Sequence, residues 1–189
     1  MNDTRTAIRT AVASIQPFDE LEAEHQKDVL HWIDSGEPLF RIAKPDNPPK
    51  HLVSYFVLFD NSHDSILLID HLKAKLWLPT GGHIEPDEDP RDTVLREAQE
   101  ELGIDAKFAS VVGDKPLFVT VGKTRGPGTH TDVSLWYVVD GKTDEVLDYD
   151  RGEFNSYKWL TLDEVLSTNI GELDPHLHRF VRKLQARLN

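Results

Sequence analysis

The sequence predicts an α/β (α+β) domain in which helices cover the faces of a mixed β-sheet, an α/β/α sandwich, preceded by a helical extension. Two observations predict this class. Many short stretches rich in branched and aromatic residues are separated by few helical ones, a pattern typical of a mixed sheet. The chain has 189 residues, of which 39% are hydrophobic, so it can build one such domain with an appendage.

Two helices are expected at the start of the chain. Ile8, Val12 and Ile15 recur at helical spacing, and a second apolar stripe runs through residues 19–33. Such stripes need a partner surface. We expect this surface to be either the rest of the chain or a second copy of the chain in a homodimer.

A proline-rich polar stretch, residues 44–49, separates these helices from the main body. Its prolines fit neither a helix interior nor a central strand, so the predicted domain boundary lies here. Residues 1–45 are then an N-terminal helical extension, and residues 46–189 are the main domain with a C-terminal helix.

The main domain is expected to begin with a β-hairpin, strands 52–59 and 66–69 joined by a polar turn. Helical patterns follow at 90–102 and 162–166, and the last helix carries an apolar stripe from Leu177 to Leu188. The remaining predicted strands are 108–112, 117–121, 134–139 and 157–160.

The composition excludes several classes of protein. With 33 acidic and 21 basic residues the net charge is −12, and no basic stripe is visible, so we expect no binding to a nucleic-acid backbone. No apolar run approaches the ~18 residues of a membrane span, and the N-terminus has no hydrophobic signal core, so no membrane association is expected. The absence of cysteine excludes disulfides and thiolate zinc sites and fits a cytoplasmic protein.

The predicted helix 90–102 carries three carboxylates beside its apolar face. At ~100° per residue, Glu97, Glu100 and Glu101 fall within about 100° of one another on the helical wheel. Like charges at this spacing cost about 0.2–0.5 kcal/mol per pair. A hard divalent cation would convert this cost into a binding site, and oxygen ligands suit Mg²⁺ or Mn²⁺. A solvated acidic helix face is the alternative interpretation.

The surrounding spacing decides between these interpretations. Gly82, Glu88 and the run Arg96-Glu97-Ala98-Gln99-Glu100-Glu101-Leu102-Gly103-Ile104 resemble the Nudix box, the 23-residue signature of Nudix hydrolases, here spanning Gly82 to Ile104. Asp87 departs from the pattern, because a glycine is frequent at that position in the family. The resemblance implies the Nudix type of α/β/α sandwich for the main domain.

The resemblance also implies roles for the matching residues. Glu97, Glu100 and Glu101 would be the main metal ligands, and Glu88 would support them from the preceding loop. The positive charge of Arg96 would orient these carboxylates. The metal would be Mg²⁺ or Mn²⁺, and Gly82 would allow the loop backbone to approach the substrate closely.

One further residue matches beyond the box. Glu153 stands six residues before Trp159, as a glutamate does in enzymes that hydrolyse 8-oxo-dGTP. It is expected to be either an additional ligand or the base that activates water, and a solvated loop glutamate is the alternative. The catalytic set implied by the resemblance is Arg96 with Glu100 or Glu153 as the proton acceptor.

The family implies hydrolysis of the pyrophosphate bond in a nucleoside diphosphate linked to a further group X, with a nucleoside triphosphate as the expected small-molecule substrate. A Nudix-like sensor that binds a nucleotide and regulates a partner is the alternative, but all the box glutamates are intact. An isomerase of prenyl diphosphates shares the fold and would want a catalytic cysteine, which this chain lacks.

Overall fold

The computed structural model describes residues 3–43, 47–124 and 129–188. The chain divides into two compact units. Three elements begin in the first unit and end in the second: strands β1 and β6 and helix α3. Unit 1 contains residues 1–55, 81–94 and 115–137, and unit 2 contains residues 56–80, 95–114 and 138–189.

The strands of unit 1 are the first part of β1 (Lys50–Asp60), most of β4 (Thr80–His83), β5 (Phe118–Lys123) and the first part of β6 (Thr131–Asp140). β5 pairs antiparallel with β6, with Phe118 opposite Trp136, while β6 and β4 are neighbours of β1. Strand β4 was not predicted from the sequence. Its Gly81 has φ +145°, and a Cβ there would collide with the Ser54 carbonyl oxygen, so the backbones of β4 and β1 are in close contact.

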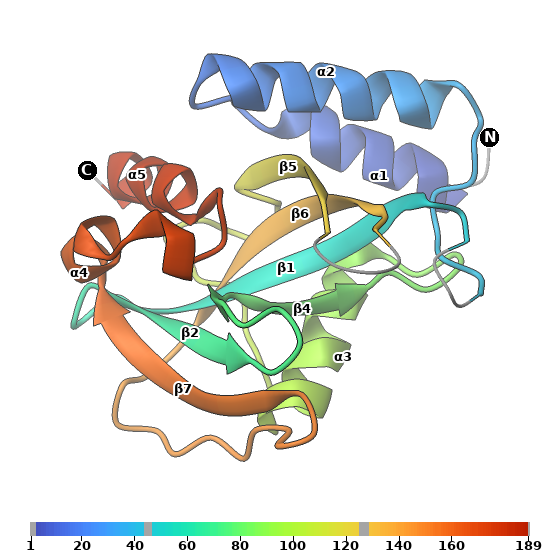
Figure 1. Cartoon of the computed structure of the whole chain (residues 1–189). Coiled ribbons are helices and arrows are strands. Elements are labelled where there is room, and N and C mark those ends of the chain that lie inside the picture. The colour runs from blue at the N-terminus through green and yellow to red at the C-terminus, as the bar shows by residue number, and fades with distance from the viewer. Residues whose placement is uncertain (1–2, 44–46, 125–128, 189) are drawn as a thin grey trace. The chain divides into compact units, whose positions relative to one another are not determined.

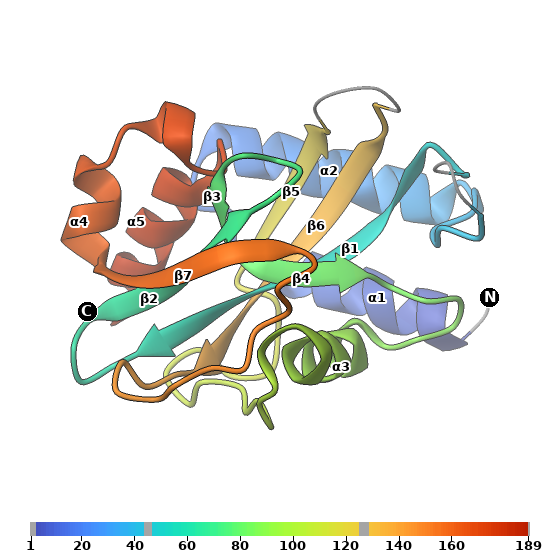
Figure 2. The same cartoon turned by 60° about the horizontal axis from the view of Figure 1, so that its bottom comes forward.

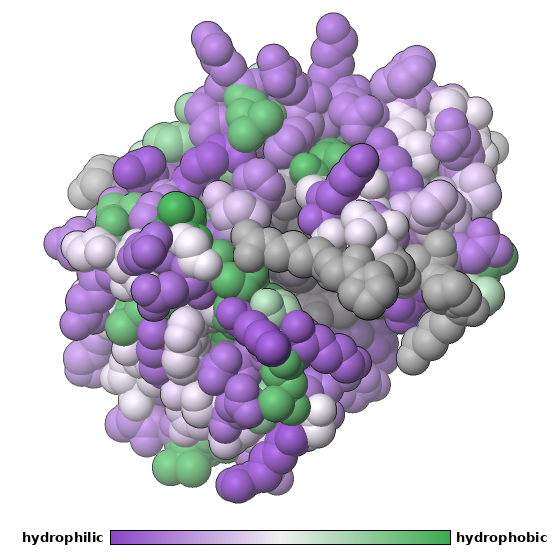
Figure 3. All heavy atoms as spheres, viewed as in Figure 1, coloured by the Kyte–Doolittle hydropathy of each residue, from purple (hydrophilic) through white to green (hydrophobic). Residues whose placement is uncertain are grey.

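The two expected N-terminal helices are present as α1 (Asp3–Ser14) and α2 (Glu20–Asp34). They lie side by side, and α2 packs along β5 (Figure 1). The outer surface of the α2 region is mostly hydrophilic (Figure 3). Most large residues of the predicted apolar stripes are buried, whereas Leu21 in the second stripe is exposed; the buried ones are Ile8, Val12, Ile15, Val29, Trp32 and Ile33.

Helix α2 also protects the edge of the sheet at β5, the strand at one end of the order β3-β2-β1-β6-β5. The buried Glu22 carboxylate accepts hydrogen bonds from the backbone N–H groups of Phe18 at 2.6 Å and Val119 at 3.4 Å. His25 Nδ1 accepts from the N–H of Val121 at 3.3 Å. Side chains three residues apart on the helix therefore cap backbone donors two residues apart on an edge strand, which would otherwise expose them for pairing with another chain.

Unit 2 is built around β2 (Ser65–His71). This strand pairs antiparallel with the end of β1, with β3 (Trp77–Leu78) and with β7 (Phe154–Thr161), and the long β2–β7 ladder is visible in Figure 2. The helical elements of unit 2 are the last part of α3 (Pro90–Leu102), α4 (Leu162–Ser167), η1 (Ile170–Glu172) and α5 (Leu177–Leu188).

The predicted strand at 108–112 was wrong. Phe108 forms only an isolated bridge with Val139, and the Ala109 carbonyl then accepts from the N–H groups of Val112 and Gly113 at 3.0 and 2.8 Å. Gly113 has φ +94°, a conformation that closes a turn and that branched residues rarely adopt. The run 108–112 therefore forms a turn rather than a strand, with only Ala109 buried.

The other predicted elements are present, with ends that differ by a few residues, and the observed sheet and helices confirm the predicted fold class. Residues 44–46 of the proline-rich connector lie outside the described residues. No helix in the described parts of the chain is long and apolar enough to cross a membrane.

The hydrogen bonds of Glu22 at the edge strand predict a measurable loss of stability when this side chain is removed. Replacing Glu22 by Ala leaves the buried N–H group of Val119 and the partly buried N–H group of Phe18 without their acceptor, so the free energy of unfolding should fall by about 1–3 kcal/mol. Urea unfolding measures this change. Glu24→Ala, an exposed position on the same helix, is the matched control and should change stability by under about 0.5 kcal/mol. Equal effects of the two substitutions would contradict the capping role.

Candidate active site

Helix α3 positions the box glutamates, and both of its ends are fixed by local interactions. At its start the Asp89 carboxylate accepts from the N–H of Arg91 at 2.9 Å, as an N-terminal capping residue does. At its end Gly103 has φ +68°, and a Cβ there would meet the Asp148 carbonyl oxygen at 3.3 Å. The N–H of Asp150 donates to the Glu101 carbonyl at 2.8 Å. The loop after β6 is thereby held against the C-terminal turn of α3.

Arg96 links two of the predicted metal ligands. Its Nη1 lies 2.7 Å from Glu97 Oε1 and 3.3 Å from Glu100 Oε2. The side chain of Glu97 is 13% exposed and that of Glu100 is 60% exposed, so the pair spans from partly buried to solvent. Glu101, on the next turn from Glu97, is also buried. The single guanidinium orients Glu97 and Glu100 but balances only part of the negative charge.

The pKa of Glu97 shows that the carboxylate of Glu153 is near enough to act on it. Burial raises the pKa of the Glu97 carboxyl, the hydrogen bond and charge of Arg96 lower it, and the negative charges of Glu100 and Glu153 raise it again, so the net pKa lies above its usual range. Glu153 is more than 50 residues further along the chain, and its loop is held by the hydrogen bond from Leu72 N–H to the Glu153 carbonyl at 2.9 Å. The structure therefore brings Arg96, Glu97, Glu100 and Glu153 together within unit 2.

Glu88 and Gly82 lie in unit 1. Glu88 Oε2 accepts from the backbone N–H of Glu85 at 2.9 Å and from Thr93 Oγ1 at 2.7 Å, so its carboxylate shapes the loop before α3. Gly82 lies in β4, next to Gly81, where the close backbone approach occurs. The roles of Glu88 toward a metal and of Gly82 toward a substrate stay predictions.

The structure explains why Asp87 can replace the glycine that is frequent at this point of the box. Its φ is +63°, in the left-handed region that glycine adopts most easily. Aspartate is one of the few other residues that enter this region at modest cost. Aspartate therefore fits the left-handed conformation that this position of the loop adopts.

One residue near the cluster was missed by the sequence analysis. His71 at the end of β2 is a close neighbour of Glu153: burial lowers the pKa of its imidazole, the charge of Glu153 raises it, Lys73 lowers it, and the net pKa is below its usual value. The β2–β7 register shifts between Asp70 and His71, which places His71 opposite Phe154. Nothing in the sequence marks this histidine, because the shift of register is a property of the paired strands.

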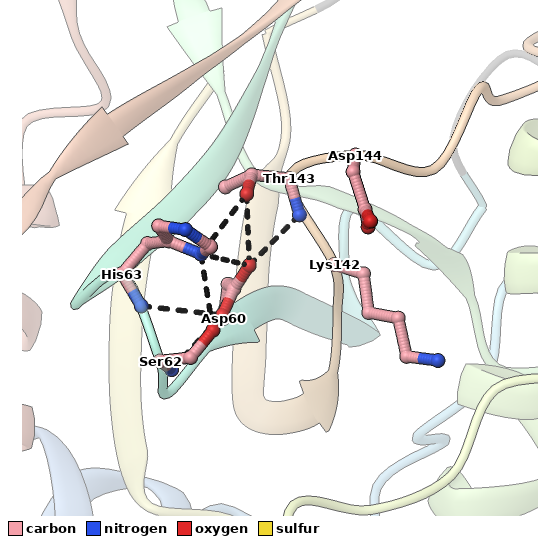
Figure 4. Close-up of a pocket in the computed structure, with 6 residues that line it drawn as sticks. All are labelled: Asp60, Ser62, His63, Lys142, Thr143 and Asp144. Carbon is pink, nitrogen blue, oxygen red and sulfur yellow. Dashed lines mark hydrogen bonds and ion pairs between the residues drawn. The ribbon is translucent and has the colours of Figure 1, made fainter.

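A separate surface pocket of about 550 Å³ lies in unit 2, lined by Asp60, Ser62, His63, Lys142, Thr143 and Asp144. Figure 4 shows Asp60 at the centre of a hydrogen-bond network. Its carboxylate accepts from the N–H and Oγ of Ser62 at 2.9 and 2.6 Å and from the N–H and Oγ1 of Thr143 at 2.8 and 3.0 Å, and it contacts His63 Nδ1 at 2.9 Å. This network joins the β1–β2 turn to the loop after β6. The pocket is therefore best explained by a structural role of Asp60.

The fold and the acidic helix define a Nudix-type domain, and the comparison with known families agrees. The model of the NUDIX domain family matches residues 49–184. The chain therefore belongs to the NUDIX family.

Curated relatives match parts of the chain. An asymmetrical bis(5'-nucleosyl)-tetraphosphatase of Sus scrofa is 37% identical over 93 residues, which are 47% of this chain and 57% of the relative. An RNA pyrophosphohydrolase of Gluconacetobacter diazotrophicus is 28% identical over 111 residues, 53% of this chain and 65% of the relative. Both matches span less than two thirds of the relative's length.

Solved structures show the same fold. A C. elegans Ap4A hydrolase has a TM-score of 0.56 at 17% identity, and the match covers 72% of this chain and 96% of that one. The NUDIX domain of Shewanella oneidensis NrtR, solved with ADP ribose, has a TM-score of 0.56 at 21% identity, with 73% and 88% covered. At these identities the likeness concerns the fold alone.

The Asp60 network predicts a pH-dependent contribution to stability. Burial on its own raises the pKa of Asp60, but the hydrogen bonds from Ser62, Thr143 and His63 outweigh burial and hold the pKa well below its usual range. A carboxyl whose pKa is lowered by folding stabilises the protein above its unfolded pKa of ~3.9, and this stabilisation is lost as the pH falls below that value. Asp60→Asn should therefore cost about 1.5–3 kcal/mol at pH 7, with a smaller difference from the wild type below about pH 4.

Urea unfolding at pH 7 and at pH 3 measures this difference. Asp144→Asn, an exposed position in the same pocket, is the control and should be nearly neutral at both values. A cost of Asp60→Asn that is the same at both pH values would contradict the assigned pKa direction.

Proposed function

We propose that the chain is a divalent-metal-dependent hydrolase that cleaves the pyrophosphate bond of a nucleoside diphosphate linked to a further group, with a nucleoside triphosphate as its substrate. The observation that carries the proposal is that Glu97 and Glu100 lie beside Arg96 on a helix with the spacing of the Nudix box, and that the charge of Glu153 acts on Glu97 from the loop before β7. Curated relatives named for pyrophosphate-bond hydrolysis support it.

The residues present fit a hard divalent cation. The cluster offers only carboxylate oxygens, the donors that Mg²⁺ and Mn²⁺ prefer. Burial first, and then the charges of Glu100 and Glu153, raise the pKa of Glu97 in spite of Arg96, and a bound cation would oppose both effects. Glu97, Glu100 and Glu101, with Glu88 or Glu153 in support, would hold Mg²⁺ or Mn²⁺. When bound, the ion supplies charge neutralisation for the substrate phosphates and lowers the pKa of a water molecule.

The protein's own residues then position the carboxylates and remove a proton from the attacking water. Arg96 fixes the orientation of Glu97 and Glu100 through its two contacts. Glu100 or Glu153 accepts the proton of the attacking water. The water oxygen bonds to one phosphorus, the bridging P–O bond breaks, and a nucleoside triphosphate yields a monophosphate and pyrophosphate. Such a reaction depends on positioning and charge neutralisation more than on covalent catalysis.

The choice of a triphosphate is supported by Glu153, whose spacing to Trp159 matches enzymes that act on 8-oxo-dGTP, and by a Bacillus subtilis relative named as a putative 8-oxo-dGTP diphosphatase, 26% identical over 117 residues. A Mg²⁺-dependent screen should include nucleoside triphosphates, 8-oxo-dGTP, dinucleoside tetraphosphates, 5'-triphosphate RNA and ADP-ribose. Release of a monophosphate from triphosphates supports the proposal. Binding without turnover of any compound would favour the sensor alternative.

Removing one ligand should change the metal requirement. Glu97→Gln and Glu101→Gln each remove a charged ligand, so the Mg²⁺ concentration for half-maximal activity should rise by about tenfold or more. Glu145→Gln, an exposed glutamate on the loop after β6, should leave this concentration unchanged. If a ligand variant kept the wild-type rate at limiting Mg²⁺, that residue would not bind the metal.

Metal binding alone should stabilise the fold. A ligand that binds the folded state raises its stability by mass action. Mn²⁺ should raise the melting temperature of the wild type, and raise it much less in a variant with Glu97, Glu100 and Glu101 all replaced by Gln. Equal shifts in both proteins would show that α3 does not carry the principal site.

Glutamine variants can also distinguish the proton-accepting residue from the metal ligands. Glu100→Gln and Glu153→Gln are compared for turnover at saturating Mg²⁺ and for Mg²⁺ affinity. Loss of the base should lower kcat by about 10²–10⁴-fold with little change in affinity, whereas loss of a ligand weakens affinity. If neither substitution lowers kcat at saturating metal, neither glutamate is the base.

A further inference from the structure

Three histidines and an aspartate that the proposed reaction does not use converge within unit 1. They are His51 on β1, His83 at the end of β4, His130 just before β6, and Asp132 on β6. One potential ligand atom from each lies within 4.8 Å of all the others. Rings of His51 and His83, and of His51 and His130, have centroids 4.9 Å apart. Four side chains that could bind a metal are thus gathered from three separate parts of the sequence.

The His51 ring is held in the form that a metal ligand requires. Its side chain is fully buried, and Nδ1 lies 2.8 Å from the Pro48 carbonyl oxygen. A carbonyl can only accept, so Nδ1 carries the proton and donates it. The lone pair of a neutral ring is then on Nε2, which faces Asp132. A backbone carbonyl on the far nitrogen is the usual partner of a metal-binding histidine.

His130 shows the same division between its two ring nitrogens. Its Nδ1 lies 3.2 Å from Thr124 Oγ1, and its Nε2 lies 3.2 Å from Asp132 Oδ1. Thr124 Oγ1 also accepts from the backbone N–H of His130 at 3.1 Å, which fixes the hydroxyl beside the ring. Thr124 therefore orients the His130 ring through Nδ1, and Nε2 faces the other members of the cluster.

The potential ligand atoms of His51 and Asp132 lie close together without forming a hydrogen bond. His51 Nε2 is 3.3 Å from Asp132 Oδ1, yet neither buried atom makes a hydrogen bond with any described residue. In a tetrahedral site with bonds of about 2.0–2.1 Å, neighbouring ligand atoms lie about 3.3–3.4 Å apart and point at the metal rather than at one another. The two separations to Asp132, 3.3 and 3.2 Å, match this spacing.

A proton is the competing occupant of the cluster. Burial lowers the pKa of His51, while Asp132 and the Pro48 carbonyl raise it by more, so a protonated His51 could pair with Asp132. Burial, together with the charge of Arg41, lowers the pKa of His83 to about 4, which leaves this imidazole neutral at pH 7. One proton can serve one nitrogen and one oxygen, whereas three imidazoles converge here. A metal ion would engage all four side chains.

We propose that His51, His83, His130 and Asp132 form a second metal site that binds Zn²⁺ or a similar transition-metal ion through three imidazole nitrogens and one carboxylate oxygen. Imidazole favours such ions over Mg²⁺, and four protein ligands close the site to substrate, as in structural zinc sites. His83 directly follows Gly82, the first residue of the box. The site would therefore tie the start of the box loop to β1 and β6, which gives it a structural role independent of the proposed reaction.

Cobalt(II) titration of the untagged full-length protein, stripped of metal with a chelator, tests this site directly. A tetrahedral N₃O site should give intense visible d–d bands that saturate at one equivalent, and added Zn²⁺ should abolish them. Mg²⁺ at millimolar concentration should not. Bands that never appear, or that a millimolar concentration of Mg²⁺ removes, would overturn the proposal without bearing on the hydrolase.

Substitutions show which residues bind the Co²⁺ that produces the visible bands. His130→Gln, at a partly exposed ligand, should weaken Co²⁺ affinity by more than about tenfold, while His31→Gln, an exposed histidine on α2, should not change it. The variant with Glu97, Glu100 and Glu101 replaced by Gln should keep the full signal, which separates the two sites. Should His130→Gln fail to fold, the wild type decides: Zn²⁺ at one equivalent must raise its melting temperature. Unchanged affinity in folded His130→Gln, or no Zn²⁺ stabilisation of the wild type, contradicts the site.

Discussion

Negative charge concentrated at the end of α3 is the constraint on which the candidate active site depends. Glu97 is largely buried, and its raised pKa records the combined effect of burial and of the carboxylates of Glu100 and Glu153. A helix does not tolerate such a cluster without cost, so the surroundings must hold it in place. They do so at Gly103, where the chain passes closely by Asp148, and through the hydrogen bond from Asp150 N–H to the Glu101 carbonyl. The same contacts bring Glu153 to the helix.

The two proposed metal sites differ in the chemistry of their donors. The α3 cluster offers carboxylate oxygens, which suit hard ions that keep open positions for water and phosphate. The cluster of His51, His83, His130 and Asp132 offers mainly imidazole nitrogens and closes around its ion. Because the preferences are opposite, each site can select its own ion from a mixture by ligand type. A single chain could then use one metal for structure and another for turnover.

Local patterns allowed much of the fold to be predicted. The apolar periods of α1, α2 and α5 and the fixed spacing of the box depend on residues close in sequence, and all four helical segments are present. Glu153 was predicted from its spacing to Trp159, and its charge acts on the Glu97 carboxyl in the structure. Its chemical role stays a prediction.

The segments and residues that were predicted wrongly or missed are those whose structure depends on tertiary contacts. Strand β4 contains two glycines, which are poor strand formers, and it forms because Gly81 lets it approach β1 closely. The apolar run after Phe108 looked like a strand, but Gly113 closes it into a turn. His71 lies near Glu153 only through a shift of strand register. The histidine cluster joins three strands, and its members are up to 81 residues apart, so no local spacing marks it.

The central claim is that a divalent ion binds among Glu97, Glu100, Glu101 and Glu153. Paramagnetic broadening by Mn²⁺ in the amide NMR spectrum tests it most directly, with the protein first saturated with Zn²⁺ to occupy the imidazole cluster. The account predicts that substoichiometric Mn²⁺ broadens the amides at the end of α3 and around Glu153 first, and that excess Mg²⁺ reverses the effect. Broadening centred on another surface, with the α3 amides unaffected, would contradict the account.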